Sequence, residues 1–303
     1  MSISNLKYPT NRLRRTRQAK WIRNLTQENA LSTNDLVWPV FVCEGNNVKD
    51  EIKSMPNVYR YSIDNLSEVY DIASKHKINL IAVFPFTPQE LKTKAGDEAL
   101  NPNNLVCRSL EKLKSHKPRF GVMCDVALDP YTDHGHDGLL SDDGKILNDE
   151  TNGVLVKQSI LLAQHGADII APSDMMDGRI GMIRDELEKK QFTDTLILSY
   201  AAKYSSGMYS PFRDAVGSSK NLKTDKKTYQ MNIFNSDESI REASMDISEG
   251  ADMIMVKPGI SYLDIIYRIK NELKYPTFAY QVSGEYSLIK FGSKQGIIDE
   301  KTA

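Results

Sequence analysis

Short apolar segments alternate with amphipathic segments over most of the chain. The apolar segments have the length of buried strands, and the amphipathic segments repeat their apolar residues at the spacing of one helix face. We predict strands at 36–43, 78–86, 120–128, 167–173, 193–203, 251–257 and 276–282. We predict helices at 63–75, 104–114, 155–165, 178–190, 236–249, 262–273 and 285–291. Apolar strands that alternate with helices are typical of a parallel sheet that helices cover.

Seven such strands in 303 residues favour an α/β fold of the (β/α)₈ TIM-barrel type over an open doubly wound sheet. A dinucleotide-binding sheet would have a GxGxxG motif after its first strand, and the sequence has none there. The eighth strand is not found, because only the helix at 285–291 and a polar end follow the seventh strand. We therefore expect a strand that the pattern does not reveal, another segment that covers the open edge, or a chain that stops early.

The start of the chain differs from the rest, since it is rich in arginine and contains few apolar residues that could form a core. The arginines are Arg12, Arg14, Arg15, Arg17 and Arg23. We interpret residues 1–30 as an arm that rests on another protein surface, although a solvated tail fits the composition equally well. Residues 31–303 would then form the catalytic barrel domain, incomplete at its C-terminal end.

Composition narrows the class of protein. The formal net charge is −1, so the chain lacks the basic surplus of proteins that bind nucleic acids or anionic membranes. No apolar run approaches the roughly 20 residues that cross a bilayer, and the N-terminus lacks the apolar core of a secretion signal. Cys43, Cys107 and Cys124 are scattered, which favours reduced thiols over a disulfide frame or a zinc site. We expect a cytoplasmic protein, although the arginine-rich start also fits an organellar transit peptide.

Polar side chains follow the predicted strands at the points where they end. They are Asp125, Ser173, Lys203, Lys257 and Ser283. A single lysine at a strand end is usually an ion-paired or partly exposed side chain. In a barrel, however, these strand ends meet on one face, where each of two lysines would disfavour the charge on the other. We interpret Lys203 and Lys257 as amines that attack a carbonyl carbon and form Schiff bases.

Five further stretches carry a family pattern. They are SYAAKYSSGMYSPFRDA, GADMIMVKPG, DVALDPYTDHGHDG, APSDMMDGRI and YQVSGEY. Together with the start RLRRTRQAKW, they make the chain resemble the porphobilinogen synthases, also called 5-aminolaevulinate dehydratases. The resemblance implies the condensation of two 5-aminolaevulinate molecules into porphobilinogen with loss of two waters, in tetrapyrrole (haem) biosynthesis.

The resemblance assigns roles to the two lysines and to a lid segment. Lys257 would form the Schiff base with the substrate on the P side and Lys203 with the substrate on the A side. Arg213, in a glycine- and serine-rich stretch that we predict to be a mobile loop, and Gln230 would hold the A-side carboxylate. Lys226 lies where the family usually has an arginine, so we expect a weaker clamp without a bidentate fork.

Further substrate contacts follow from the same resemblance. Asp125 would orient the A-side amine or transfer a proton, and Ser173 would be a second contact. Tyr200 and Phe212 match pocket residues of the family, although ordinary packing explains them equally well. Ser283 would contact the P-side carboxylate.

The metal region separates branches of the family. The cysteines of the zinc-dependent branch are replaced by Ala127, Asp129 and Asp137, which excludes a three-cysteine zinc site. Oxygen ligands suit Mg²⁺ or a monovalent cation at Asp129 and Asp137. His134 and His136 leave a zinc site as a less favoured alternative.

A second ion site would involve Glu242. The resemblance implies an allosteric Mg²⁺ held there through waters between subunits, in a homo-octamer whose arms wrap neighbouring subunits. A glutamate on a helix surface, paired one turn away, is the alternative.

Two other functions remain open at this point. A class I aldolase also uses a barrel lysine as a Schiff base, but it needs only one and would not explain Arg213. A truncated, inactive subunit is the other alternative, because the tyrosine that accompanies Ser283 in the family would lie beyond Ala303.

Overall fold

The computed structural model describes residues 7–218, 222 and 225–303, which fall into two compact units, Met1–Leu36 and Val37–Ala303. The described part of the first unit contains the helix α1 (Lys20–Leu25) and the 3₁₀ turns η1 (Leu13–Arg17) and η2 (Thr33–Asp35). None of its described residues is buried, and Trp21 is 69% exposed. This unit therefore has no core of its own in the residues described.

The second unit is built on a sheet with the strand order β2-β3-β1-β4-β5-β6-β7-β8-β9. All neighbours in it are parallel except β2 and β3, which are antiparallel. The strands are β1 (Val37–Cys43), β2 (Lys49–Glu51), β3 (Tyr59–Ser62), β4 (Leu80–Pro85), β5 (Gly121–Val126), β6 (Ile169–Pro172), β7 (Leu196–Lys203), β8 (Met253–Lys257) and β9 (Thr277–Ala279).

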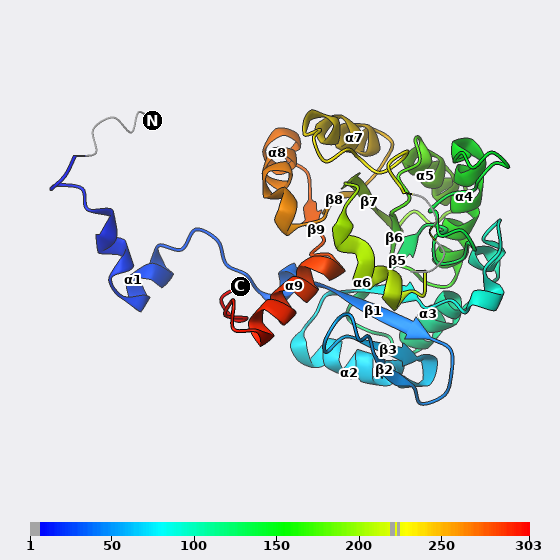
Figure 1. Cartoon of the computed structure of the whole chain (residues 1–303), viewed down its shortest axis with the longest axis horizontal. Coiled ribbons are helices and arrows are strands. Elements are labelled where there is room, and N and C mark those ends of the chain that lie inside the picture. Colours follow the sequence, from blue (N-terminus) through cyan, green and yellow to red (C-terminus); the bar gives the residue numbers. More distant parts are fainter. Residues whose placement is uncertain (1–6, 219–221, 223–224) are drawn as a thin grey trace. The chain divides into compact units, whose positions relative to one another are not determined.

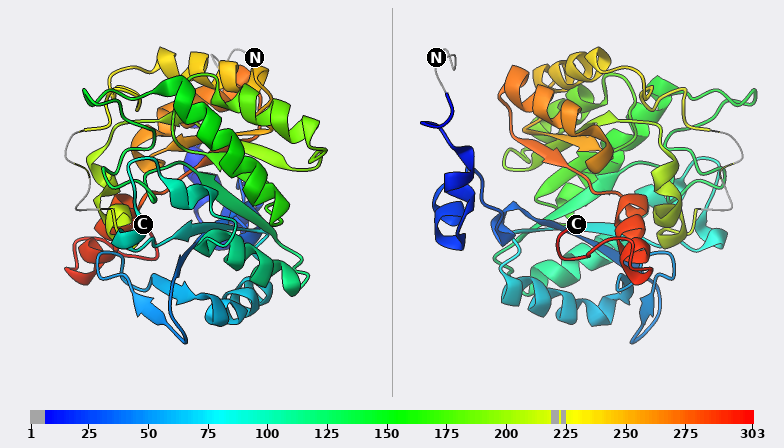
Figure 2. Two further views of the ribbon diagram at one scale, coloured as in Figure 1. Left: turned by 90° about the vertical axis from the view of Figure 1, so that its right-hand side faces the viewer. Right: turned by 60° about the vertical axis from the view of Figure 1, so that its left-hand side comes forward.

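Helices follow most of the parallel strands and cover the outside of the sheet (Figures 1 and 2). The α-helices are α2 (Leu66–His76), α3 (Leu105–Ser115), α4 (Asn148–Gln164), α5 (Arg179–Lys189), α6 (Ser210–Ala215), α7 (Asp237–Ser248), α8 (Leu263–Leu273) and α9 (Ser283–Lys294). The 3₁₀ turns are η3 (Ile63–Asn65), η4 (Gln89–Leu91), η5 (Asp97–Leu100), η6 (Gly207–Tyr209) and η7 (Ile260–Tyr262). No helix in the described part of the chain is long and apolar enough to cross a membrane.

Two buried apolar clusters lie on opposite faces of the sheet. In β4, Ile81 and Val83 belong to the cluster under the helices, whereas Ala82 and Phe84 belong to the second cluster. Successive side chains of a strand point to opposite faces, so the second cluster fills the inside of the curved sheet. A filled interior with helices outside is the α/β barrel architecture that the sequence predicts.

All seven predicted strands are present, as β1 and β4 to β9, but two strands were missed. β2 is a fully exposed KDE segment and β3 a four-residue YRYS segment, so neither shows an apolar run. The expectation of a strand that the pattern does not reveal is confirmed at the first strand, because β3 pairs in parallel with β1 there, with Phe41 opposite Arg60. Within the described residues, β9 pairs only with β8.

The glycine- and serine-rich stretch around Arg213, predicted to be a loop, is helical in part of its described residues, because it contains η6 and α6. Pro211 lies in the first turn of α6, where its fixed backbone angle favours a helix, and Ala215 at the end of α6 is fully buried. α6 and α9 lie side by side (Figures 1 and 2). Gly284 in α9 packs against η6, because a Cβ there would lie 2.7 Å from Met208 Cα.

We predict that Gly284→Ala lowers the melting temperature, since the added methyl group has no space between two backbones and overpacking costs about 1–3 kcal/mol. Gly153→Ala is the matched control, because Gly153 is also helical but faces open space within 4 Å. It should be neutral or stabilising by roughly 0.5–1 kcal/mol. Thermal unfolding of both variants checks this, and equal melting temperatures would contradict the close contact.

Candidate active site

The candidate site is a cavity at the C-terminal ends of β5 to β8, closed by η6 and α6 and by residues just before α7. Side chains from these strand ends meet there because the strands are parallel neighbours. Its lining residues are Asp125, Asp129, Ser173, Lys203, Tyr209, Phe212, Arg213, Lys226, Gln230 and Lys257. The structure thus brings most of the predicted site residues together.

The two lysines are direct neighbours across the sheet. Lys203 ends β7 and Lys257 ends β8, and the register pairs one with the other. Paired residues of parallel strands direct their side chains to the same face, and both lysines line the same cavity. Each is only 6% exposed, so the two amines share a site with little water.

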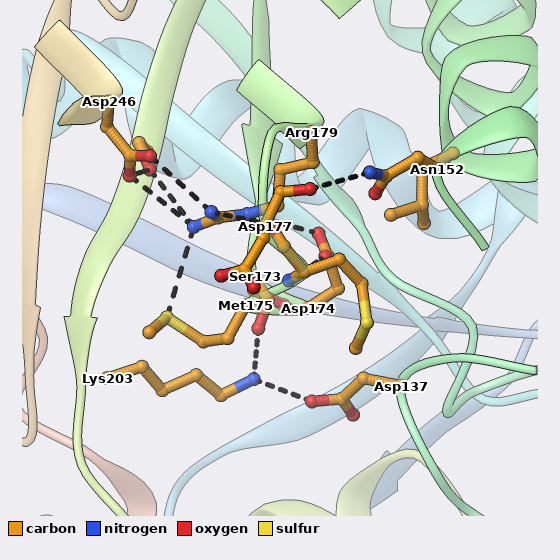
Figure 3. A network of polar contacts seen from close by, with 12 residues as sticks. Asp137, Asn152, Ser173, Asp174, Met175, Asp177, Arg179, Lys203 and Asp246 are labelled. Atoms are coloured by element: carbon orange, nitrogen blue, oxygen red, sulfur yellow. Dashed lines mark hydrogen bonds and ion pairs between the residues drawn. The ribbon is translucent and has the colours of Figure 1, made fainter. Parts of the chain in front are cut away.

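Lys203 is held as a member of a buried ion pair (Figure 3). Its Nζ donates to Asp137 Oδ2 at 3.0 Å and also to the backbone oxygen of Ser173. Asp137 is completely buried and accepts a second bond from Lys226 Nζ at 2.5 Å. Burial raises the pKa of Asp137, but the charges of Lys203 and then Lys226 outweigh burial and hold that pKa well below its usual value.

Lys257 lies among aromatic rings and, unlike Lys203, forms no ion pair with a carboxylate in the described residues. Its Nζ is 4.5 Å from the ring centroid of Tyr280, 5.0 Å from Tyr200, 5.2 Å from Phe212 and 5.6 Å from Tyr209. Burial, and then the charge of Lys203, lower the pKa of Lys257 to about 7. The ring faces favour the charged amine and oppose this shift, but loss of hydration is the larger effect for a buried cation.

Lys203 and Lys257 therefore differ in their resting state. Above its lowered pKa Lys257 carries a free electron pair, and it is this neutral amine that attacks a carbonyl carbon. Lys203 is compensated by Asp137 and contributes the positive charge that helps to keep its neighbour neutral. The predicted repulsion between the two amines is thus present in the structure.

Two buried polar atoms beside the lysines have no hydrogen-bond partner in the described residues. They are Asp125 Oδ1 and the Tyr200 hydroxyl. Burial, followed by the charge of Asp129, raises the pKa of Asp125 to about 6. Unpartnered buried polar atoms are rare in proteins, so these atoms are suited to a polar group of a bound molecule.

The segment that closes the cavity contributes Arg213 and Phe212 from α6. In the described residues no carboxylate lies within ion-pairing distance of Arg213, which leaves its guanidinium available for an anionic ligand. Ser283 lies at the start of α9, beside this segment. Its Oγ accepts from Phe212 N at 2.8 Å and donates to Met208 O at 3.4 Å, so it fastens α6 to α9 and does not line the cavity.

Comparison with known proteins identifies the family. Residues 10–303 match the family model described as delta-aminolevulinic acid dehydratase. The chain belongs to the delta-aminolevulinic acid dehydratase family. It is 54% identical over 288 residues to the enzyme of that name from Bradyrhizobium diazoefficiens, covering 95% of this chain and 81% of the relative. The Rhodobacter capsulatus enzyme is 47% identical over 296 residues, covering 98% and 89%.

A solved structure of the family supports the fold. It is the Toxoplasma gondii delta-aminolevulinic acid dehydratase in complex with its reaction product porphobilinogen. The similarity has a TM-score of 0.93 at 45% identity and covers 96% of this chain and 83% of that one. The predicted family and barrel fold are therefore confirmed.

The two predicted cation ligands, Asp129 and Asp137, both contact Lys226. Lys226 Nζ lies 2.5 Å from Asp137 Oδ1 and 3.4 Å from Asp129 Oδ2, so its ammonium occupies the place between the carboxylates. No group of three or more metal-ligating side chains is found in the described part of the chain. His134 and His136 have rings 5.7 Å apart, but His136 Nδ1 faces the hydroxyl of Tyr229.

Glu242, the other predicted ion site of this dehydratase, lies outside the cavity on α7. Its Oε1 is 3.6 Å from Nη1 of the fully buried Arg179, which also contacts Asp246 and Asp174 (Figure 3). Burial raises the pKa of Glu242 to about 7, although Arg179 opposes the shift. Its side chain is 22% exposed.

Two aromatic residues of the site were missed from the sequence. Tyr209 and Tyr280 lie in stretches that carry the family pattern, but neither was singled out. Tyr280 directly follows β9, and Tyr209 lies in η6, where side chains of both reach Lys257. Tyr280 could have been found as Lys257 was, because it also lies near the end of a predicted strand. The place of Tyr209 in the site depends on how a segment predicted to be a loop folds.

We predict that the reactivity of Lys257 rises as the pH passes about 7, because the neutral amine forms above the lowered pKa. Trace labelling with acetic anhydride, followed by peptide mass spectrometry, measures this reactivity residue by residue. Lys189, whose side chain is 68% exposed, is the internal comparison in the same sample. Identical pH profiles for the two lysines would contradict the assignment of Lys257 as the neutral amine.

Proposed function

We propose that the chain is a porphobilinogen synthase that condenses two 5-aminolaevulinate molecules into porphobilinogen and two waters, in tetrapyrrole biosynthesis. The observation that carries the proposal is the pair of neighbouring buried lysines, Lys203 and Lys257, in one cavity. Two ketone substrates that each form a Schiff base use two amines, and two lysines that line one cavity bring both substrates into one site. Family membership and the porphobilinogen complex of the Toxoplasma relative support the same activity.

Lys257 is the better nucleophile at rest. Its neutral amine adds to the ketone of one substrate, and the resulting carbinolamine loses water to give a Schiff base. Asp125, with a pKa of about 6, is suited to moving the protons of this dehydration near neutral pH. The rings around Lys257 then stabilise the positive charge of the protonated imine.

Lys203, an ammonium in its ion pair with Asp137, must first pass a proton to a carboxylate of the site, and its neutral amine would then take the second substrate. The paired charges hold its Nζ in a fixed place beside Lys257, so the two bound substrates lie close together. Such positioning removes the entropy cost of a bimolecular encounter, and effective molarities of about 10⁵ M or more are known for well-oriented groups. A class I aldolase would leave this second amine and Arg213 without a role.

The substrate carboxylates require cations and hydrogen-bond donors. We assign the A-side carboxylate to Arg213 and Gln230, which face the cavity with Phe212. Lys226 forms ion pairs with Asp129 and Asp137. We therefore propose that it balances the charge of these two aspartates beside the A-side substrate and interacts only weakly with the substrate carboxylate. Ser283 would act on the P side through the position of α6.

Borohydride trapping tests the proposed function. With 5-aminolaevulinate present, reduction should attach substrate to the peptide that contains Lys257 and, in a smaller or later fraction, to the Lys203 peptide. Lys257→Ala should reduce porphobilinogen formation roughly 1,000-fold or more, as for other lost nucleophiles. Lys189→Ala is the control and should leave the activity unchanged. A folded protein that gives no adduct would contradict the proposal.

The proposed ion requirement rests on the contacts of Lys226 and of Glu242. The ammonium of Lys226 occupies the Asp129–Asp137 place, so the residues present do not fit a divalent ion there. Glu242 fits one hydrated Mg²⁺, because a single partly exposed carboxylate can hold an ion that keeps most of its waters. We propose a magnesium-type enzyme in which Mg²⁺ would supply charge compensation at Glu242, outside the reacting centre.

We predict that Mg²⁺ binding weakens as the pH falls below about 7, since protons then compete for the Glu242 carboxylate, whose pKa is raised to about 7. Isothermal titration calorimetry at several pH values measures this binding directly. Glu242→Gln should abolish it, whereas Glu238→Gln, one turn earlier on α7, should not. Activity that zinc restores after chelation, and magnesium does not, would contradict the magnesium assignment.

We also propose that the first unit serves self-association, in a homo-octamer. Its described part buries none of its residues, including Trp21 and Leu25, so these side chains need another surface. The three cysteines are free and buried, which suits a reducing, cytoplasmic environment.

A further inference from the structure

The helix α6, which carries Phe212 and Arg213 over the cavity, cannot be stable by itself. It has six residues, and helices shorter than about 12 residues are marginal in water without tertiary contacts. Its last backbone carbonyl groups also lack partners within the helix and need donors from elsewhere. Something outside the helix must therefore hold it over the lysines.

Arg60 supplies those donors. Its Nη2 donates to Asp214 O at 2.7 Å and its Nε to Ala215 O at 2.8 Å, so one guanidinium binds two consecutive carbonyls at the C-terminal end of α6. A cation at this end also interacts favourably with the helix dipole. Arg60 lies in β3, a strand fixed to β1 on one side and to β2 on the other.

The guanidinium itself is held in place on its remaining sides. Nη1 of Arg60 donates to Asp50 Oδ2 at 3.1 Å, and its Cζ lies 4.7 Å from the ring centroid of Phe86. The side chain is 12% exposed, so water competes little for its bonds. Arg60 is therefore a rigid donor attached to the sheet, and its planar fork matches the two carbonyl groups.

Neighbouring residues hold the same end of the segment. Ser54 Oγ donates to Asp214 Oδ2 at 2.6 Å, and Lys92 Nζ donates to Gly217 O at 3.0 Å. Gly217 has φ +71°, and a Cβ there would lie 2.8 Å from Phe86, so the chain leaves α6 by a turn that needs glycine. These contacts fix α6 at its C-terminal end. Arg213 lies in the last turn of α6 and is therefore close to the fixed end.

We propose that Arg60 is a positioning residue that locks α6 over the two lysines and so sets the apparent affinity for the substrate. The proposal rests on the proposed function. Arg60 does not line the cavity, and it acts through the carbonyls of Asp214 and Ala215 next to Arg213. Without this cap, α6 spends less time docked. The apparent affinity for the substrate is the affinity of the docked state multiplied by the fraction of molecules in which α6 is docked. Saturating substrate still shifts the equilibrium to the docked state.

Arg60→Gln should therefore raise KM for 5-aminolaevulinate roughly 10-fold or more, in line with the loss of charged hydrogen bonds, and change kcat much less. Arg60→Lys keeps the charge but loses the fork, so its KM should be intermediate. Millimolar guanidinium, added to Arg60→Ala, should lower KM again, because it can occupy the vacated position. A purely structural role would predict neither the KM-specific change nor this rescue.

Arg184 provides a matched control. Its guanidinium also binds two carbonyls and one aspartate, namely Gly250 O and Thr195 O at 3.1 Å and Asp252 Oδ2 at 2.5 Å. Its side chain is 16% exposed, close to the value for Arg60, but its partners precede β7 and β8, at the opposite end of the strands from the cavity. Arg184→Gln should lower the melting temperature and leave KM unchanged.

Hydrogen exchange gives a readout that does not depend on turnover. The amides of 207–218 should exchange faster in Arg60→Gln than in the wild type, and Arg184→Gln should leave them unchanged. Equal KM values for the Arg60 and Arg184 variants, or unchanged exchange in 207–218, would overturn the proposal. If the wild type forms no porphobilinogen, the proposed function fails, but the exchange comparison still tests the cap.

Discussion

The account depends on one register, in which Lys203 and Lys257 end neighbouring parallel strands and line the same cavity, each with only 6% of its surface exposed. Two ammonium groups in such a place are unfavourable unless one is compensated and the other loses its proton. In the structure, Asp137 compensates the charge of Lys203, whereas aromatic rings surround Lys257. A nucleophile and a fixed charge thus arise from the same residue type through their surroundings.

The other parts of the molecule serve this arrangement at increasing distance. The apolar strands bring the lysines to one face, and the buried cluster inside the sheet excludes water beneath them. Lys226 pairs with the carboxylates of Asp129 and Asp137 beside the cavity. Arg60, on a strand at the side of the sheet, holds α6 and with it Arg213 above the cavity. The strands, the charge of Lys226 and the helix α6 are thus separate features that all act at the cavity of the two lysines.

Much of this could be predicted from the sequence, because buried strands leave a strong apolar pattern and parallel strands end on one face. Lys203, Lys257 and Asp125 were found in that way. β2 and β3 were missed because their residues are exposed or few, although β3 carries Arg60. The partners of Lys226 and Ser283 could not be predicted, since they depend on where a distant segment folds back. Local pattern therefore gives the strands and their ends, and tertiary packing decides which polar groups meet.

The most direct test of the central claim is the pKa of Lys257 in the Lys203→Met variant, measured by NMR on lysine labelled with ¹³C at the ε-carbon. Removing the neighbouring charge while keeping a side chain of similar length should raise this pKa above about 7. It should still stay below the ordinary lysine value of about 10.4, because burial persists. An unchanged pKa would contradict the claim that the charge of Lys203 lowers the pKa of Lys257.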